Sequence, residues 1–199
     1  MRIAVFSDIH GNYELLDKTL NGISAMNADE VICLGDILGK GPESLRAMRR
    51  IISEGITTVQ GNWEMYYNRG YEKFKYEINQ DDFYREFTSQ LTPEEDKWIR
   101  NLPWEHVVEV DNRRILFMHF PLEDLDRNYP FYFLKRLRDG SIQEVFDEMD
   151  YDMMVFGHAH ISSAMGKVVL IPSTLSEQYE FLIIDVQDGE IEYSRHIVR

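Results

Sequence analysis

The sequence predicts an α/β fold around a parallel sheet, and two observations carry that prediction. Residues 3–6 form an apolar run that ends at Ser7 and Asp8, and leucines and isoleucines then recur at helical spacing over residues 15–23. The same order returns at residues 31–34, where Gly35 and Asp36 lead to a second helical face over residues 45–52. Two consecutive strand, loop and helix units indicate a βαβ crossover between parallel strands.

The next segment predicts a third strand and then a helical elaboration. Residues 56–59 form an apolar run that ends at Gly61 and Asn62. Residues 63–103 have a helical and irregular pattern, with a helix start at Thr92, Pro93 and Glu95. That order places a capping threonine, a proline at the first helical position and a glutamate at the third.

Strands dominate the second half of the chain. Valines at 107, 108 and 110, a turn at residues 111–112 and the apolar run 115–118 predict a hairpin. A helix over residues 141–149 precedes a strand at 153–156. Further strands are expected at residues 168–171, 181–186 and 191–193, the last two joined by the turn at Asp188 and Gly189.

Length and charge limit the classes of protein. A chain of 199 residues with 44% hydrophobic content buries a substantial core, so we expect one domain over residues 1–199. The 21 basic and 35 acidic side chains give a net charge of −14, which disfavours a long nucleic acid as partner. A small phosphorylated substrate is not excluded, because bound metals reverse the local field. A homo-oligomer is left open.

The lone cysteine and the apolar runs point to an interior thiol and a cytoplasmic chain. Cys33 lies within the apolar run 31–34 and has no partner for an internal disulfide, so we expect it to be buried and structural. No apolar run approaches the length of a membrane span. The apolar segment at residues 1–6 is too short for the apolar region of a signal sequence and is followed by a charged residue, Asp8. We therefore expect a soluble cytoplasmic protein without a membrane partner.

Five short polar groups each directly follow an apolar run that we expect to be a strand. A single Asp or His in a loop is ordinarily a cap or a turn residue. Five groups in equivalent positions are poorly explained by coincidence, and loops at equivalent strand ends gather where ligands bind. The groups are Asp8-Ile9-His10, Gly35-Asp36, Gly61-Asn62, His119 and Gly157-His158-Ala159-His160.

These residue types are those of a metal site. Oxygen ligands and imidazoles without cysteine suit Mn²⁺, Fe or Zn²⁺ better than Ca²⁺ or a thiolate-seeking ion. In the D-x-H and H-x-H pairs, alternate residues of an extended segment point to one side and can supply two ligands. A carboxylate such as Asp36 can also bridge two ions.

In this order the motifs resemble those of the calcineurin-like metallophosphoesterase superfamily, which run D-x-H, G-D, G-N-H-D/E, H and G-H-x-H. The resemblance covers almost the full chain. Residues 35–42, GDILGKGP, and the segment from Leu91 to Pro103 are similar to those of the small bacterial phosphoesterases.

The resemblance implies a four-layer αββα sandwich with two mixed sheets and a dinuclear metal site at the carboxyl ends of the strands. It implies two ions, with Mn²⁺ expected first and Fe, Zn²⁺ or Ni²⁺ as alternatives. A hydroxide shared by the ions would attack phosphorus, and Asp36, Asn62 and His119 would serve the catalytic centre. One ion would take Asp8, His10, Asp36 and His160, and the other Asp36, Asn62, His119 and His158.

The chain departs from the family motif at Trp63, where relatives carry the histidine of G-N-H-D/E. That histidine contacts the phosphate and helps to protonate the leaving oxygen, and such acid catalysis contributes about 10²–10⁴ in rate. An indole donates a hydrogen bond but delivers no proton near neutral pH. Three outcomes stay open: turnover of substrates with good leaving groups, an acid from another residue, or binding without turnover.

Two weaker signals concern the surroundings of the site. Residues 171–174 read IPST, where small bacterial relatives often read Asn-Pro-Gly-Ser, and His106 and His196 match no motif. Aromatic residues at 63–71 and in the segment 121–139 could border the pocket, with Lys135, Arg136 and Arg138 nearby to meet phosphate. The alternative, which we favour, is a small satellite core or self-association surface beside a solvated helix.

The sequence therefore predicts a metal-dependent phosphoesterase, a hydrolase acting on a small phosphodiester or phosphomonoester, with diesters slightly preferred. The alternative function is a metal-binding scaffold of low or no activity that binds a partner or ligand. A dinuclear hydrolase of the metallo-β-lactamase type would need an early H-x-H-x-D-H run, and this sequence contains none.

Overall fold

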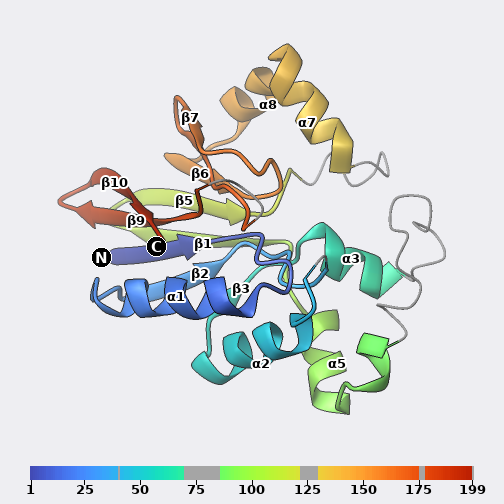
Figure 1. Ribbon diagram of the computed structural model, residues 1–199. Helices are drawn as coiled ribbons and strands as arrows, with labels where there is room; N and C mark the ends of the chain where they lie inside the picture. The colour runs from blue at the N-terminus through green and yellow to red at the C-terminus, as the bar shows by residue number, and fades with distance from the viewer. Residues whose placement is uncertain (40, 70–85, 122–129, 175–177, 199) are drawn as a thin grey trace.

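The computed structural model describes residues 1–39, 41–69, 86–121, 130–174 and 178–198. Two five-stranded sheets face each other at the centre of the molecule (Figure 1). We call them sheet A, with strand order β10-β9-β1-β2-β3, and sheet B, with strand order β4-β5-β6-β8-β7.

Sheet A contains the two crossover units predicted from the sequence. Strand β1 pairs in parallel with β2, and β2 with β3, while β9 joins β1 in antiparallel register. Helices α1 and α2 connect the parallel strands. The elements are β1 (Arg2–Phe6), α1 (Tyr13–Ser24), β2 (Glu30–Cys33), α2 (Ser44–Glu54), β3 (Thr57–Thr58), β9 (Glu180–Gln187) and β10 (Glu190–Ile197).

Sheet B is also mixed. The predicted hairpin forms between β4 and β5, and β5, β6 and β8 run in parallel. Strand β7 was not predicted; it is a three-residue edge strand with an exposed residue at its centre, so it lacks a hydrophobic signal. The strands are β4 (Glu105–Val110), β5 (Arg113–Met118), β6 (Met153–Phe156), β7 (Ser163–Met165) and β8 (Val168–Leu170).

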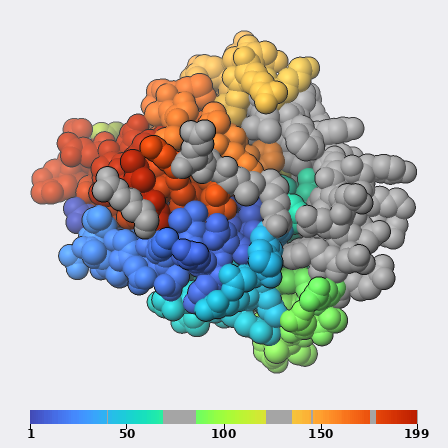
Figure 2. Space-filling model, in the orientation of Figure 1, coloured from blue at the N-terminus to red at the C-terminus, as the bar shows by residue number. Residues whose placement is uncertain are grey.

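Helices cover the outer face of each sheet, which confirms the four-layer sandwich. Helices α1 and α2 lie outside sheet A, and α7 (Pro130–Asp139) and α8 (Ile142–Glu148) lie outside sheet B (Figure 1). In the space-filling view these two helical layers form opposite sides of the molecule (Figure 2).

The alternation of side chains along the strands builds two cores. Ile3 and Val5 of β1 belong to an inner core between the sheets, together with Phe117 and Val155 of sheet B. The intervening Ala4 and the following Phe6 point the other way and belong to the cluster that contains Leu16 of α1. Because β1 is buried on both faces, it reads as a continuous apolar run.

The remaining described helices extend the sandwich near β3. Helix α3 (Asn62–Arg69) follows β3, and α5 (Pro93–Arg100) begins with the predicted capping box, in which Thr92 and Glu95 bond each other's backbone N–H. Parts of the predicted elaboration and pocket-bordering segment, residues 70–85 and 122–129, lie outside the described residues. Within the described ranges, no helix is both long and apolar enough to cross a membrane.

Candidate metal centre

Strand ends bring all seven predicted ligands together. Asp8 and His10 follow β1, Asp36 follows β2, and Asn62 opens α3 just after β3. His119 follows β5, and His158 and His160 follow β6. Strands β1, β2 and β3 run in parallel in sheet A, as do β5 and β6 in sheet B, and residues 59–61 lead from β3 to Asn62. The carboxyl ends of these strands therefore meet at one edge. The arrowheads of β1 and β5 point to this edge in Figure 1.

The backbone at these positions is unusual. Five of the seven residues have left-handed φ angles between 49° and 60°. This conformation costs an L-residue about 1–2 kcal/mol, although Asp and Asn tolerate it better than most. Strain of this kind persists where the surroundings over-determine it and is concentrated at functional sites. The five residues are Asp8, His10, Asp36, His158 and His160.

One group of donors, which we call the first cluster, consists of Asp8, His10 and His160. The Nε2 atoms of His10 and His160 lie 3.2 Å apart, and Asp8 Oδ1 lies 3.1 Å from His160 Nε2 and 3.7 Å from His10 Nε2. The second oxygen of Asp8 accepts bonds from the Ser7 hydroxyl and the His158 amide. Within the described residues, Oδ1 is buried and has no hydrogen bond of acceptable geometry.

The other group, the second cluster, consists of Asp36, Asn62, His119 and His158. The amide oxygen of Asn62 lies 2.8 Å from His158 Nδ1 and 3.1 Å from His119 Nε2. His119 Nε2 is also 3.4 Å from Asp36 Oδ2. The donor atoms of Asp36, His119 and His158 all lie within 4.8 Å of one another.

Asp36 stands between the clusters. Its Oδ2 atom lies 3.4 Å from His119 Nε2 in the second cluster and 3.8 Å from His10 Nε2 in the first. Its Oδ1 atom accepts the backbone N–H of Trp63 at 2.9 Å, which fixes the orientation of the carboxylate. Oδ2 therefore faces an imidazole nitrogen of each cluster.

Backbone carbonyls orient two of the imidazoles. His10 Nδ1 lies 3.2 Å from the carbonyl of Leu38, and His119 Nδ1 lies 2.8 Å from the carbonyl of Leu34. Only a protonated Nδ1 can donate to these carbonyls, so the neutral ring presents the lone pair of Nε2 to the site. Carbonyl or carboxylate partners of this kind orient metal-binding histidines in general.

The electrostatics show how strongly the carboxylates and imidazoles interact. Burial opposes ionisation of Asp8 and Asp36, yet His119 and the other imidazoles hold the pKa of each carboxyl below its ordinary value. Burial likewise opposes charge on His119, but the carboxylates of Asp36 and Asp8 raise its pKa to about 9. The site attracts positive charge.

The donor set fits a pair of divalent ions. Among the described residues, Asp8 Oδ1 is a buried acceptor without a hydrogen bond, and a cation between the convergent donors would satisfy it. Carboxylate, amide and imidazole donors suit Mn²⁺, Fe and Zn²⁺. Cys33 is buried, as predicted, and burial raises the pKa of its thiol, so it acts as an apolar side chain.

Trp63 lies beside the first cluster, in contact with His10. Its indole is 6% exposed and meets the His10 ring edge-on at a centroid distance of 6.0 Å. A Cβ atom on Gly39, whose φ is +97°, would lie 2.3 Å from the indole. The indole therefore needs a glycine at position 39, and it covers one side of the site without offering an acid.

Two residues that the sequence analysis did not assign support the loops of the site. Thr174 donates its hydroxyl to the carbonyl of Ile9 at 3.0 Å, and its backbone N–H bonds the carbonyl of Asp8. Glu64 is 1% exposed and accepts backbone N–H groups from the loop that carries Asp36. The signal for Glu64 was its place at the acidic position of the G-N-H-D/E motif, and the signal for Thr174 was the IPST segment at residues 171–174.

The aromatic residues described near Asn62 belong to the core. Tyr66 and Tyr67 are 3% and 9% exposed and belong, with Trp63, to the same hydrophobic cluster as Phe6 and Leu16, so they are part of a main core rather than of a small satellite core. Lys135 and Arg138 are exposed on α7. The proposed aromatic contacts of Tyr71 and of the side chains at 129–133 lie outside the described residues.

The unassigned histidines lie away from the metal centre. His106 Nε2 lies 3.0 Å from a carboxylate oxygen of Glu30. His196 stacks on Phe181 and contacts the Ser194 hydroxyl. These contacts are with groups outside the two clusters, as expected for ordinary strand histidines.

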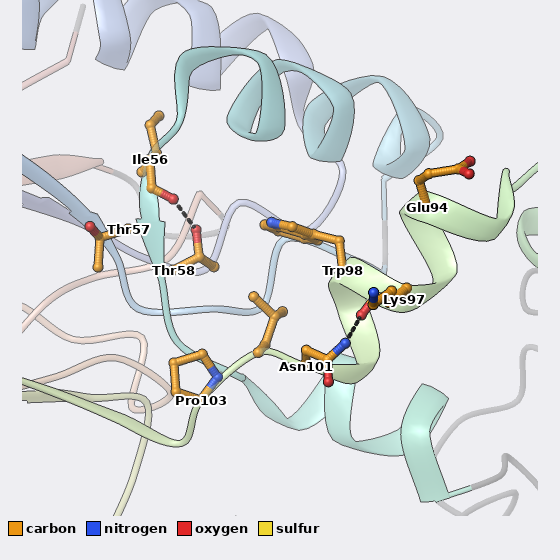
Figure 3. Close-up of a pocket in the computed structure, with 9 residues that line it drawn as sticks. Ile56, Thr57, Thr58, Glu94, Lys97, Trp98, Asn101 and Pro103 are labelled. Atoms are coloured by element: carbon orange, nitrogen blue, oxygen red, sulfur yellow. Dashed lines mark hydrogen bonds between the residues drawn. The ribbon is translucent and has the colours of Figure 1, made fainter.

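A separate groove of about 530 Å³ lies between the edge strand β3 and α5 (Figure 3). Trp98 extends from α5 toward the strand, with Leu102 and Pro103 nearby. The polar groups drawn there bond within their own segments, Thr58 to the carbonyl of Ile56 and Asn101 to that of Lys97. None of the seven predicted ligands lines this groove, so it is distinct from the candidate metal centre.

Comparison with known proteins identifies the family. The calcineurin-like phosphoesterase superfamily domain matches residues 1–188, and the chain belongs to this superfamily. Membership indicates a phosphoesterase hydrolase that uses divalent metal ions, which agrees with the resemblance found in the sequence.

Individual relatives cover most of the chain, and solved structures share its fold. The chain is 27% identical over 187 residues to the uncharacterized protein MJ0912 of Methanocaldococcus jannaschii, covering 91% of this chain and 73% of the relative. A metallophosphoesterase from Sphaerobacter thermophilus has the same fold, with a TM-score of 0.65, 17% identity and coverage of 100% and 89%. An archaeal phosphodiesterase is similar with a TM-score of 0.55, 15% identity and coverage of 99% of both chains.

Proposed function

We propose that this protein is a dinuclear metal-dependent phosphoesterase that hydrolyses a small phosphodiester or phosphomonoester. The observation that carries the proposal is the convergence of the two clusters on Asp36, whose Oδ2 atom faces an imidazole nitrogen of each. The unsatisfied Oδ1 of Asp8 in the first cluster supports it.

The proposed ligands follow the two clusters. The first ion would be held by Asp8, His10, Asp36 and His160, and the second by Asp36, Asn62, His119 and His158, with Mn²⁺ expected first. Two bound ions in such a site supply an activated water and stabilise the negative charge of the reacting phosphate.

Backbone groups hold the proposed ligands in place, and Trp63 limits the reactions that the site can catalyse. The carbonyls of Leu34 and Leu38 keep the imidazoles of His119 and His10 oriented, and the N–H of Trp63 keeps Asp36 in place. Trp63 has no group that protonates a leaving oxygen near neutral pH. We therefore expect substrates with good leaving groups to be favoured, and diesters slightly over monoesters.

The first experiment measures metal content together with hydrolysis. Purified protein is loaded with Mn²⁺, dialysed and assayed on para-nitrophenyl phosphate and on its bis ester. We expect two ions per chain and activity that disappears in Asp36→Asn. Asp185→Asn, which changes an exposed carboxylate on β9, serves as the matched control and should behave as wild type. Wild-type protein that binds no metal would refute the proposal.

The second candidate function is a metal-binding scaffold that binds a partner or ligand without turnover. Trp63 favours it, because the indole occupies the place beside His10 where the superfamily motif carries histidine. The discriminating variant is Trp63→His. If the metal-loaded wild type is inert on both esters and Trp63→His gains activity, the scaffold explains these data better than the enzyme.

A further inference from the structure

The carboxylate of Glu64 is buried beside the loop that carries Asp36, and within the described part of the chain its hydrogen bonds are to backbone N–H groups. Oε2 accepts the N–H groups of Asp36 at 2.9 Å and Gly61 at 3.0 Å. Oε1 accepts those of Ile37 and Leu38, each at 3.0 Å. An ionised carboxylate offers about four acceptor sites. These four bonds occupy them, so Glu64 has no lone pair left for a metal ion.

The segment that Glu64 holds carries contacts to both clusters. It contains Asp36, whose left-handed φ of 51° turns the carboxylate toward the imidazoles. The carbonyl of Leu38 meets Nδ1 of His10, and the carbonyl of Asp36 accepts the backbone N–H of His10 at 2.8 Å. Gly61, the fourth donor to Glu64, directly precedes Asn62. One side chain therefore joins the loop after β2 to the loop after β3.

We infer that Glu64 is a positioning residue that fixes Asp36 and Asn62 relative to each other and so forms the second metal position. The inference rests on the proposed function as a dinuclear enzyme. The second cluster depends on the positioning of Asp36 by Glu64 more than the first cluster does. Without a correctly placed Asp36 the first cluster still has the carboxylate of Asp8, whereas the second keeps only the neutral donors of Asn62, His119 and His158.

Glu64→Gln tests the bonding directly. The amide keeps the shape of the side chain but replaces one acceptor oxygen with an NH₂ group, which would face two backbone N–H donors. Loss of a supporting contact of this type commonly lowers metal affinity about 10–100-fold. We expect Glu64→Gln to bind the first ion with nearly wild-type affinity and the second ion 10–100-fold more weakly.

The readouts are metal stoichiometry and the magnetic coupling between bound ions. Metal content is measured after equilibrium dialysis against increasing Mn²⁺, and electron paramagnetic resonance distinguishes a coupled Mn²⁺ pair from a single ion. Glu64→Gln should lose the coupled signal at Mn²⁺ concentrations that saturate the wild type. Glu95→Gln is the matched control, because Glu95 also accepts a backbone N–H, that of Thr92, but lies in α5.

Glu64→Asp keeps the charge and withdraws the carboxylate by one methylene group. We expect its second-ion affinity to lie between those of the wild type and Glu64→Gln. If Glu64→Gln does not fold, the inference requires Glu64→Asp to bind the second ion several-fold more weakly than wild type.

The possible failures are distinguishable. Wild-type affinity for both ions in Glu64→Gln, or in Glu64→Asp where the glutamine variant is unfolded, would overturn the positioning role and leave the proposed enzyme intact. A wild-type protein that binds fewer than two ions would instead contradict the proposed function.

Discussion

His119 is a buried imidazole whose protonation is controlled by neighbouring carboxylates and which is also a proposed metal ligand. It is 1% exposed, it donates from Nδ1 to the carbonyl of Leu34, and its Nε2 faces Asp36 and Asn62. Burial lowers the pKa of the imidazole, but Asp36 and Asp8 outweigh burial and raise the pKa from the ordinary 6.5 to about 9. In the metal-free protein, an imidazolium at His119 therefore occupies the place of a cation.

This state predicts that metal binding releases a proton. Below the raised pKa of about 9 the metal-free His119 is protonated, and a metal needs the deprotonated Nε2. At neutral pH we expect release of about one proton from His119 per second-cluster ion, declining as pH rises through about 9. Calorimetric titration with Mn²⁺ in Hepes and in Tris, buffers with different ionisation heats, measures this release.

The control for the proton release is His106→Gln, which changes a strand histidine paired with Glu30 and should release the same number of protons as wild type. Identical binding heats in the two buffers at neutral pH would contradict the protonated state of His119.

At the scale of elements, α5 begins at a capping box within its own sequence and is attached to α2 by an ion pair. Thr92 accepts the N–H of Glu95, and Glu95 accepts the N–H of Thr92 at 2.8 Å. Glu95 also forms an ion pair with Arg49 of α2 at 2.6 Å. The capping box thus both begins α5 and attaches it to α2.

Removing the cap should destabilise this helix without disturbing the metal centre. Loss of an N-cap threonine typically costs about 1 kcal/mol, so Thr92→Ala is expected to lower the free energy of unfolding by about that amount. Urea denaturation followed by circular dichroism measures the change, and Mn²⁺ stoichiometry should stay at the wild-type value. Ser89→Ala, an exposed serine three residues earlier, is the control. Equal stability of the two variants would show that the capping box contributes nothing.

At the scale of the whole molecule, the candidate site joins the two sheets. Asp8 and Asp36 extend from sheet A, whereas His119 and His158 extend from sheet B. The inner core between the sheets is apolar and includes Ile3, Phe117 and Val155. Metal ions would thus add a polar connection between two sheets that pack on an apolar inner core.

This arrangement predicts that a chelator lowers the thermal stability of the protein. Saturation at a hundred times the dissociation constant stabilises a folded state by about 2.7 kcal/mol. For a chain of this size each kcal/mol shifts the melting temperature by about 2–4 °C. Differential scanning calorimetry with Mn²⁺ and with EDTA should show this shift in the wild type and a smaller one in Asp36→Asn. Identical melting temperatures in Mn²⁺ and EDTA would count against a metal that links the sheets.

Much of the fold and the identity of the site residues could be predicted from the sequence, because both depend on local order. Apolar runs of strand length, helical spacing in residues 15–23 and 45–52, and the cap at Thr92 each specify an element within a few positions. Polar residues placed directly after strands, from Asp8 to His160, then fall together once parallel strands align their ends. Their role as ligands is still a prediction that metal measurements must test.

The tertiary structure decided how these residues are held. The carbonyl that orients His119 belongs to Leu34, 85 positions away, and Thr174 supports Asp8 and Ile9 from a loop 166 and 165 positions away. Position 39 has no room for a Cβ atom because the indole of Trp63 packs against it. Sequence patterns carry information about neighbours along the chain, whereas hydrogen bonding of backbone groups between distant loops depends on the folded arrangement. The sequence by itself therefore determined which donors this protein has, and only the fold decided which carbonyls face the imidazoles, how Asp36 lies between the two clusters and which backbone groups the buried carboxylate of Glu64 accepts.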